Sequence, residues 1–356
     1  MQLKVSLIIN IHNSSDYVEN ISNTINSLSN KIEIILVDDC STDKSCEKIS
    51  NLTKNSSYKF IKLKVPSGIS KSRNIGIENA TREFISFMDH DDSINNNEFI
   101  KSSSKVNHLD ENSLIVCPYT TSFYKDNLII TDRLISKERE INTNNLTNIN
   151  YRFSSFSNSR ETYHICLSAW SKFYSMKIIK SKSLKFKEGM DKFEDCSFGL
   201  SYLYSVKKIY ILENNFYTYS QARFKPSGLT NKYNIHNWLG WIDELNNELN
   251  FQKINNKKIS IQFLSIFLIG TIIRYLNICR LSKINLLTQE INKMKINHRH
   301  LLKMHTRPPG ADFFLTLILR YQLFTFAWIY CRLKRALKSK KYTPPLWCIS
   351  EKADEL

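Results

Sequence analysis

A short apolar run that ends abruptly in acid constrains the fold of this chain more than any other feature. Residues 84–88, Phe-Ile-Ser-Phe-Met, are too few for a helix and predict a buried strand. Asp89, Asp91 and Asp92 follow within four positions. Ligands of open α/β sheets bind outside the carboxyl ends of the strands, and carboxylates there suit Mg²⁺ or Mn²⁺ bridging to phosphates. The alternative is a solvated acidic turn in which Asp92 or Ser93 caps the next helix.

The chain upstream repeats this pattern. Residues 32–37 form a second apolar run, which ends in Asp38 and Asp39; these acids could also simply cap the helix that follows. Further strands are predicted at 5–11 and 59–65, and apolar residues at helical spacing predict helices at 17–28, capped by Asp16, and at 69–80. This alternation predicts an α/β fold with a mixed, mostly parallel sheet and helices on both faces.

Charge and cysteine content narrow the class of partner and the compartment. The 356 residues include 50 Lys and Arg against 33 Asp and Glu, a formal charge of +17, which indicates an anionic partner. That partner could be nucleic acid, a membrane surface or a phosphorylated substrate. The eight cysteines form no C-x-x-C pair or zinc-spaced cluster, which favours reduced thiols in the cytoplasm. The first apolar run is only seven residues long and reads as a strand rather than a signal peptide.

Four segments in sequence order carry a resemblance to a known family. They are Val-Ser-Leu-Ile-Ile-Asn-Ile-His-Asn (5–13), Ile-Ile-Leu-Val-Asp-Asp-Cys-Ser-Thr-Asp (34–43), Gly-Ile-Ser-Lys-Ser-Arg-Asn-Ile-Gly-Ile (68–77) and Phe-Met-Asp-His-Asp-Asp (87–92). They resemble the successive motifs of family 2 glycosyltransferases of the bacterial surface-polysaccharide type, which have the GT-A fold. The resemblance implies a nucleotide-sugar donor, with a UDP-sugar expected, a divalent Mn²⁺ or Mg²⁺, and inversion at the anomeric carbon.

The same resemblance assigns residues to the donor and the metal. Asp91 is the expected metal ligand, and Asp89 a second metal or donor contact. Asp39 is expected near the base, Arg73 near the ribose or diphosphate, and Arg223, by a looser match, on the departing diphosphate. A solvated loop arginine is the alternative for that last residue. The full set of implied donor contacts is Ile9, His12, Asp39, Gly68, Arg73, Asp89 and Arg223.

A catalytic base is expected further along the chain. Residues 170–172, Trp-Ser-Lys, and 193–198, Phe-Glu-Asp-Cys-Ser-Phe, are similar to the second half of the same fold. By that match Asp195 deprotonates the acceptor hydroxyl, opposite the leaving nucleotide, and Glu194 orients the loop or binds the acceptor. The alternative is that both acids only open a surface helix, where the helix dipole favours negative charge. Trp170 could form an apolar face for the acceptor sugar or belong to the core.

Three positions depart from the family pattern. Asn10 stands where a proline is usual, His12 where a tyrosine is usual, and Pro66 where an asparagine commonly precedes the glycine turn. All three lie near the expected nucleotide. They do not change the fold prediction, but the identities of the nucleotide base and of the donor sugar are left undetermined.

The second half of the chain predicts an acceptor side and a helical region. Residues 142–151 are expected to be an acceptor-side loop, and helices are expected at 233–250, 259–279 and 281–294. The predicted division is a GT-A catalytic domain (1–230, with a nucleotide-binding half 1–100 and an acceptor half 101–230), a helical region (231–310) and a basic amphipathic segment (311–356).

The basic segment explains where the excess positive charge lies. Residues 313–331 are apolar apart from Arg320 and Gln322, and six basic residues without an acid follow at 332–341. An arginine at mid-bilayer costs about 2.5 to 3.5 kcal/mol, so a helix lying in the interface of an anionic membrane is favoured over a spanning helix. The alternative is a buried helix followed by a solvated basic tail.

These observations predict a metal-dependent, inverting hexosyltransferase on the inner face of the cell membrane. It would move a sugar from a nucleotide sugar to a hydroxyl of a bacterial surface glycan or lipid-linked acceptor, with no nucleic-acid partner. One alternative is a sugar nucleotidyltransferase, but residues 10–15 lack the glycine-rich basic loop that such an enzyme needs after its first strand. The other is a non-enzymatic basic membrane- or nucleic-acid-binding protein, which leaves the ordered acids unexplained.

Overall fold

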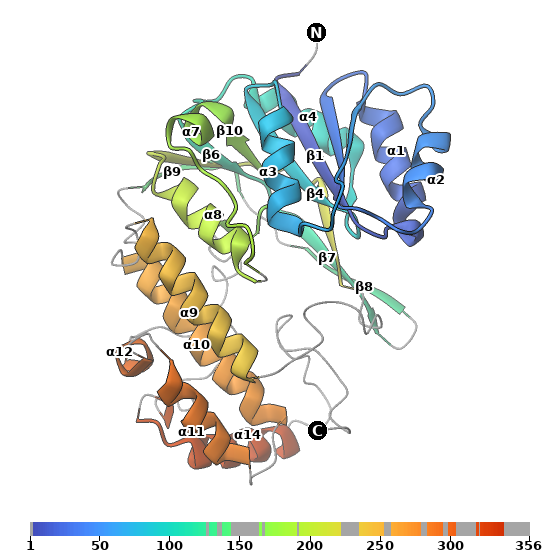
Figure 1. Cartoon of the computed structure of the whole chain (residues 1–356). Helices are drawn as coiled ribbons and strands as arrows, with labels where there is room; N and C mark the ends of the chain where they lie inside the picture. Colours follow the sequence, from blue (N-terminus) through green and yellow to red (C-terminus); the bar gives the residue numbers. More distant parts are fainter. Residues whose placement is uncertain are drawn as a thin grey trace. The chain divides into compact units, whose positions relative to one another are not determined.

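The computed structural model describes most of the chain, in segments (Figure 1). The described residues are 3–125, 128–133, 137–143, 164–165, 168–190, 192–221, 235–252, 258–278, 283–294, 298–303, 318–319 and 321–337. The chain divides into two compact units: unit 1 comprises Met1–Leu146 and Glu161–Ala222, and unit 2 comprises Thr147–Arg160 and Arg223–Leu356.

Unit 1 is built on a mixed sheet whose first four strands are parallel. In spatial order its eight strands are β3 (Lys59–Lys62), β2 (Glu33–Asp38), β1 (Val5–Ile11), β4 (Phe84–Asp89), β10 (Lys172–Ser175), β6 (Ser113–Val116), β11 (Lys208–Ile211) and β9 (Arg139–Asn142). Strands β3, β2, β1 and β4 run parallel, while β10 is antiparallel to both β4 and β6. The α/β class and the mostly parallel sheet predicted from the sequence are confirmed.

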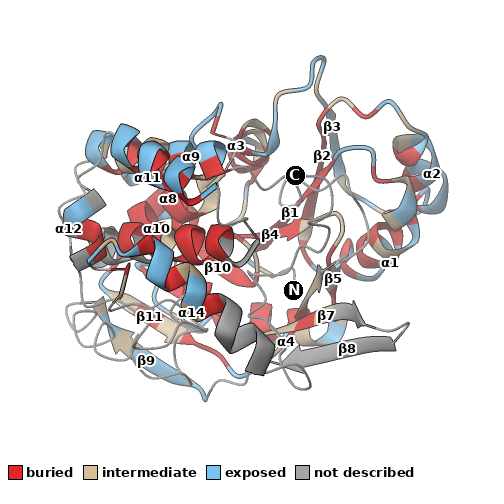
Figure 2. Ribbon diagram, turned by 90° about the horizontal axis from the view of Figure 1, so that it is seen from below, coloured by how far each residue is buried: buried red, intermediate tan, exposed pale blue. Residues whose placement is uncertain are grey.

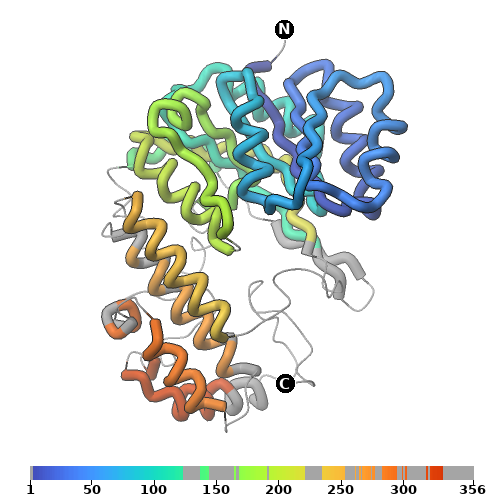
Figure 3. The backbone as a smooth tube through the Cα atoms, in the orientation of Figure 1, coloured from blue at the N-terminus to red at the C-terminus, as the bar shows by residue number. Residues whose placement is uncertain are grey.

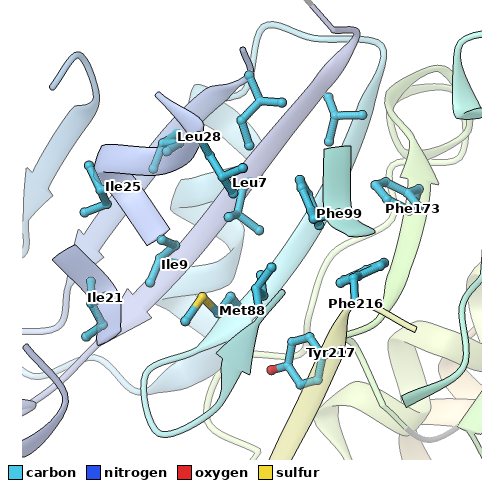
Figure 4. Packing of buried hydrophobic residues seen from close by; sticks show 14 of the residues in the cluster. Leu7, Ile9, Ile21, Ile25, Leu28, Met88, Phe99, Phe173, Phe216 and Tyr217 are labelled. Atoms are coloured by element: carbon cyan, nitrogen blue, oxygen red, sulfur yellow. The ribbon is translucent and has the colours of Figure 1, made fainter. Parts of the chain in front are cut away.

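Alternation along β1 decides which side chains enter the core. Every β1 residue is buried, and Val5, Leu7, Ile9 and Ile11 share one face because successive side chains of a strand point to opposite sides. That face packs against α1 (Val18–Leu28) and α4 (Asn96–Val106), as Figure 4 shows for Ile9, Ile21 and Phe99. The red ribbons of β1, β2 and β4 in Figure 2 show how completely these central strands are covered.

The opposite face of β1 packs against α3 (Ile69–Asn79) at very short range. A Cβ added to Gly76 would lie 2.3 Å from Cγ2 of Ile8, so the glycine allows the helix backbone to approach the strand. Ile8, Asn10 and Asp89 share this face, since Asn10 and Asp89 are register partners across β1 and β4. The helix α3 therefore lies over the strand ends that carry the acids.

A second, four-stranded sheet adjoins those strand ends. Its order is β5 (Ser93–Ile94), β12 (Tyr217–Gln221), β7 (Tyr119–Lys125) and β8 (Leu128–Arg133). The pairing of β5 with β12 brings residues from the end of unit 1 beside the acid stretch that follows β4. Three further helices are described in this unit: α2 (Ser45–Leu52), α7 (Met176–Ser181) and α8 (Glu194–Leu203).

Two predicted helix caps are wrong. Asp92 does not cap the next helix; Asn95 does, because its Oδ1 accepts a 3.2 Å hydrogen bond from the backbone N–H of Glu98. Asp16 lies inside a short 3-10 helix (Ser15–Tyr17) that precedes α1, so it is not the cap residue either. The Asp92 carboxylate instead contacts β12.

Unit 2 is helical, as predicted from residue 233 onward. Figure 3 shows α9 (Ile235–Phe251) and α10 (Lys258–Ile278) packed along each other, and the remaining described helices are α11 (Ile284–Lys293), α12 (His298–Lys303) and α14 (Phe324–Leu337). None of the helices within the described residues combines the length and the apolar character needed to cross a membrane.

The expected single helix through residues 313–331 is wrong in one respect. The backbone N–H groups of Gln322 and Leu323 donate to the carbonyls of Leu319 and Ile318, and Gln322 has a φ of 57°. This pattern is a Schellman motif, which ends a helix through a left-handed residue. A new helix, α14, begins two residues later at Phe324 and extends to Leu337, so the apolar end of the segment and the start of the basic run share one helix.

Candidate active site

The acids at the end of β4 lie in two different environments. Asp92 is 1% exposed, and its carboxylate accepts hydrogen bonds from the Tyr217 hydroxyl (2.6 Å) and the Ser220 backbone N–H (2.8 Å). Burial, together with the neighbouring charges of Asp89 and Asp91, raises the pKa of Asp92 well above its usual value. Asp89 and Asp91 are only half-buried, which leaves them within reach of a ligand.

Asp39 at the end of β2 organises the glycine turn. Its two carboxylate oxygens accept hydrogen bonds from the backbone N–H groups of Ser67 (2.7 Å) and Gly68 (2.8 Å). Gly68 has a φ of 83°, a conformation that glycine adopts without strain, and α3 begins at the next residue. His12 contacts the carbonyl oxygen of Asp39 through Nδ1 at 2.7 Å. The predicted donor residues His12, Asp39 and Gly68 therefore form one connected group.

Arg73 joins the acid stretch to the predicted catalytic pair. Its guanidinium is 4% exposed and donates from Nη2 to Oδ1 of Asp89 (2.9 Å) and from Nη1 to Oε1 of Glu194 (3.0 Å). Burial alone would lower the pKa of Arg73, but the two carboxylates outweigh burial and raise it. The side chain is fully charged and fixed. Sequence reasoning placed Arg73 at the donor and missed its contact with Glu194, 121 positions further along the chain.

The predicted base stands at the start of α8. Phe193, with a φ of 66°, turns the chain into the helix, and Glu194 and Asp195 form its first turn. Burial, then the charge of Glu194, raises the pKa of Asp195 to about 7, although Arg73 and the backbone N–H of Cys196 act in the opposite direction. A carboxylate with a pKa near neutral pH is suited to accept a proton from a hydroxyl. Glu194 and Asp195 open the helix, and the role of Asp195 as the base stays a prediction from the resemblance.

An aromatic stack lies beside the acid stretch. The Trp170 ring is parallel to those of Tyr217 (4.8 Å between centroids, 4°) and Tyr219 (5.2 Å, 15°), and Tyr119 meets it edge-on at 4.8 Å. Trp170 is half-buried, so it belongs partly to the packing and partly to the surface. The tyrosines at alternate positions of β12 carried the sequence signal for this stack, because the residues of one strand face share that spacing.

The Ile9 side chain does not fit its predicted role as a donor contact, and the neighbouring Asn10 is a new candidate. Ile9 is fully buried in the hydrophobic cluster under α1, so its side chain cannot reach a donor. Asn10 points to the α3 face and is 3% exposed, yet its Oδ1 and Nδ2 have no hydrogen-bond partner in the described part of the chain. Buried polar groups are normally paired, so an unpaired amide beside the acids suggests a ligand. Arg223 and most of the predicted acceptor loop lie outside the described residues.

Asp89 and Asp91 fit a divalent cation that takes its remaining ligands from the donor diphosphate and from water. Within the described residues, no three His, Cys, Asp or Glu side chains cluster so as to hold a metal ion by themselves. Mg²⁺ typically takes one or two protein carboxylates and completes its shell with phosphate and water oxygens. Asp89 and Asp91 supply that number of hard oxygen ligands at a strand end, so this donor set fits Mg²⁺ or Mn²⁺ that arrives with a diphosphate.

Comparison with known sequences finds relatives among glycosyltransferases. The model of the family described as glycosyl transferase family 2 matches residues 6–173. An uncharacterized glycosyltransferase of Haemophilus influenzae is 35% identical over 114 residues, 32% of this chain and 44% of the relative. The uncharacterized glycosyltransferase EpsJ of Bacillus subtilis is 26% identical over 64% of this chain and 62% of its own length. The poly(ribitol-phosphate) beta-N-acetylglucosaminyltransferase TarS of Staphylococcus aureus is 24% identical over 62% of this chain and 36% of its own length.

The chain thus spans less than two thirds of each of these relatives. Solved structures show the same fold over nearly all of it. The crystal structure of S. aureus TarS 1-349 in complex with UDP-GlcNAc aligns with a TM-score of 0.62 at 18% identity, covering 96% of this chain and 93% of that one. TarS 1-349 in complex with UDP aligns with a TM-score of 0.58 over the same shares. Residues 6–173 thus match glycosyl transferase family 2, and the fold of the chain is the GT-A fold.

Proposed function

We propose that the protein is a metal-dependent, inverting glycosyltransferase that moves a sugar from a UDP-sugar to a hydroxyl of a bacterial surface glycan or of a lipid-linked acceptor. One observation supports this proposal more strongly than any other. The acid stretch that would hold the donor and the helix turn that would supply the base meet at a single buried guanidinium, that of Arg73. The match of residues 6–173 to the family model and the fold support the reaction class.

Asp195 is the residue proposed to start the reaction. With a pKa of about 7, its carboxylate is substantially ionised at neutral pH and can take the proton of the acceptor hydroxyl as the oxygen attacks the anomeric carbon. The oxygen forms a bond to that carbon while the bond to the diphosphate oxygen breaks on the opposite side. The configuration of the carbon is therefore inverted, and UDP leaves with the electron pair of the broken bond.

The departing diphosphate gathers negative charge, which fixed positive groups must stabilise. A divalent cation at Asp91 and Asp89 would supply part of that stabilisation when it is bound. Arg223 would supply another part if, as the sequence predicts, it reaches the diphosphate. Asp39, His12 and the backbone around Gly68 form the group proposed to bind the nucleoside, with the unpaired amide of Asn10 beside them.

UDP-GlcNAc is the first donor to test, because a TarS fragment of the same fold was crystallised with UDP-GlcNAc and with UDP. TarS is named for transfer of N-acetylglucosamine to poly(ribitol phosphate), which suggests a related surface polymer as acceptor. The aromatic stack around Trp170 offers a flat apolar face of the kind that sugar rings contact, and it adjoins the acid stretch through Tyr217.

Membrane attachment through α14 is proposed as the localisation of the enzyme. One side of this helix is buried through Phe324, Ala327 and Cys331. Its other side and the preceding turn expose Tyr321 (71%), Leu323 (46%), Phe326 (63%) and Ile329 (43%), ahead of the acid-free basic run. Exposed apolar residues followed by positive charge are typical of helices that lie on anionic bilayers, where each basic residue adds roughly 1 kcal/mol.

Vesicle binding tests this attachment directly. We expect the protein to co-sediment with phosphatidylglycerol vesicles and not with phosphatidylcholine vesicles, and Phe326→Ser with Ile329→Ser to abolish binding. Phe251→Ser is the matched control, because Phe251 is 79% exposed on α9. Equal binding by the double variant would remove α14 as the membrane contact.

A thermal-shift screen of nucleotide sugars tests the activity proposal. In the presence of Mn²⁺, UDP-GlcNAc or another UDP-sugar should raise the melting temperature of the wild-type protein, and ADP- or GDP-sugars should raise it less. Asp91→Ala should lose the Mn²⁺-dependent part of the shift, whereas Asp43→Ala, on the loop before α2, should keep it. Stabilisation by nucleoside triphosphates alone would instead favour a nucleotidyltransferase.

A further inference from the structure

Arg73 links two elements on which opposite ends of the proposed reaction depend. Asp89 is the last residue of β4, and Glu194 is the first of α8, directly before the proposed base. Bonds of 2.9 and 3.0 Å from one guanidinium hold both carboxylates. Because Arg73 is only 4% exposed, this bridge is shielded from water and from salt.

A group of aromatic rings next to Arg73 forms a second bridge between β4 and α8. The ring of Phe186 lies 5.2 Å from the Arg73 guanidinium carbon. It stacks on Phe198 of α8, with centroids 4.1 Å apart at 11°, and meets Phe87 of β4 edge-on at 5.4 Å. Phe87 lies two residues before Asp89, and Phe198 lies one helical turn after Glu194. The ionic bridge therefore rests on an aromatic bridge between the same strand and helix.

The residue after Arg73 fixes the aromatic bridge in place. Asn74 donates from Nδ2 to the carbonyl of Phe186 (2.9 Å) and accepts from its backbone N–H at Oδ1 (2.8 Å). An amide that makes both bonds to one residue fixes that residue's backbone. Two consecutive residues of α3 thus control how far α8 stands from the end of β4.

We infer that Arg73 is a positioning residue, which sets the separation between the donor acids and the base instead of binding the nucleotide. This inference rests on the proposed function, since the separation matters only if Asp195 deprotonates an acceptor hydroxyl that attacks a donor held at Asp89 and Asp91. In-line displacement tolerates little error in that geometry, and a misplacement of about 1 Å can lower the rate about 10²-fold. Lysine cannot replace the bridge, because a single ammonium lacks the planar fork that spans two carboxylates.

Kinetics of Arg73→Lys distinguishes positioning from binding. We expect kcat for UDP-sugar turnover to fall about 10²-fold, while the KM for the UDP-sugar and the UDP affinity change no more than about threefold. Arg139→Lys, an exposed arginine on β9, is the matched control and should leave both parameters unchanged. Arg73 Nε is buried without a partner among the described residues, so a nucleotide contact through it would instead raise KM and leave kcat unaltered. That result would overturn the inference.

A stability cycle tests the bridge even if the wild-type protein turns over no UDP-sugar, in which case the proposed function fails separately. Arg73→Met and Glu194→Leu should each lower the urea midpoint, because each single change leaves a buried charge without one of its partners. The double variant should therefore lower the midpoint clearly less than the sum of the two single changes. Lys208→Met with Glu140→Leu, an exposed pair 3.0 Å apart, should be additive. Additive losses for Arg73 and Glu194 would show that the bridge does not couple α3 to α8.

Discussion

The hydroxyl of Tyr217 donates a 2.6 Å hydrogen bond to Oδ2 of Asp92 and accepts one of 3.2 Å from the backbone N–H of Asp89. A single phenol on β12 therefore holds both ends of the acid stretch. Residue 217 is 125 positions away from Asp92, so the second sheet is part of the candidate site and does more than cover it.

Tyr217→Phe should expose the strength of this contact. The change leaves the buried carboxyl of Asp92 with one donor fewer, and such a loss lowers the free energy of unfolding by about 1 to 3 kcal/mol. Urea denaturation measures the loss. Tyr321→Phe, at a 71% exposed position of unit 2, should have no effect. An unchanged midpoint for Tyr217→Phe would mean that Asp92 does not depend on the phenol.

The activity should depend on the ionisation of Asp195. Its pKa is raised to about 7, so the carboxyl is protonated and inactive as a base at pH 5 and ionised above that value. We expect kcat/KM to rise about tenfold per pH unit below this pKa and to level off above it. Glu194→Gln removes a charge that raises the pKa of Asp195, so the rise should shift to lower pH. A flat profile from pH 5 to 8 would argue against a carboxylate base with this pKa.

Gly76→Ala should destabilise unit 1 although alanine favours helices. Alanine gains about 1 kcal/mol of helix propensity over glycine, but its Cβ would lie 2.3 Å from a methyl carbon of Ile8. Overpacking of that kind costs about 1 to 3 kcal/mol, and Ile8 is fully buried and cannot move aside freely. A net loss of about 1 kcal/mol in urea denaturation is expected from these two magnitudes. Gly240→Ala has open space around its Cβ and should be neutral or stabilising.

Asn10→Leu should separate stability from donor binding. The amide is buried without a partner among the described residues, and replacing an unsatisfied polar group by an apolar one of similar shape removes a penalty of about 1 to 3 kcal/mol. The melting temperature should therefore rise, while the KM for the UDP-sugar should increase because a donor contact is lost. A variant that gains stability and keeps its KM would show that Asn10 does not contact the donor.

Much of the fold was predictable because its signals are local. The apolar runs at 5–11 and 84–88 became β1 and β4 almost residue for residue, and the helices of unit 2 followed their periodicity. The errors came from competing local chemistry. Asp92 was a reasonable cap from sequence, but its burial beside Tyr217 is a tertiary effect. The left-handed residue that ends a helix is usually glycine, and because Gln322 occupies this position, nothing in the sequence indicated the turn.

The site was predictable only in its motifs. Asp39, Asp89 and the Glu194–Asp195 pair were identified by resemblance, and the structure brings Asp89 and Glu194 onto one arginine. That connection could not be derived from the sequence, because it depends on the aromatic bridge through Phe186 and on the face that β4 presents to α3. Because successive side chains of β1 point to opposite faces, the Ile9 side chain lies in the core under α1 and the Asn10 side chain lies on the face of Asp89.

The role of Asp195 as the base in sugar transfer is tested most directly by UDP release. Wild-type protein, Asp195→Asn and the control Asp110→Asn, whose carboxylate lies on an exposed turn before β6, should be incubated with UDP-GlcNAc, Mn²⁺ and a poly(ribitol phosphate) acceptor, and the UDP quantified by chromatography. We predict that wild type and Asp110→Asn release UDP at equal rates and that Asp195→Asn is slower by about 10² to 10⁴-fold, with unchanged UDP affinity. Equal release by Asp195→Asn would contradict its assignment as the base.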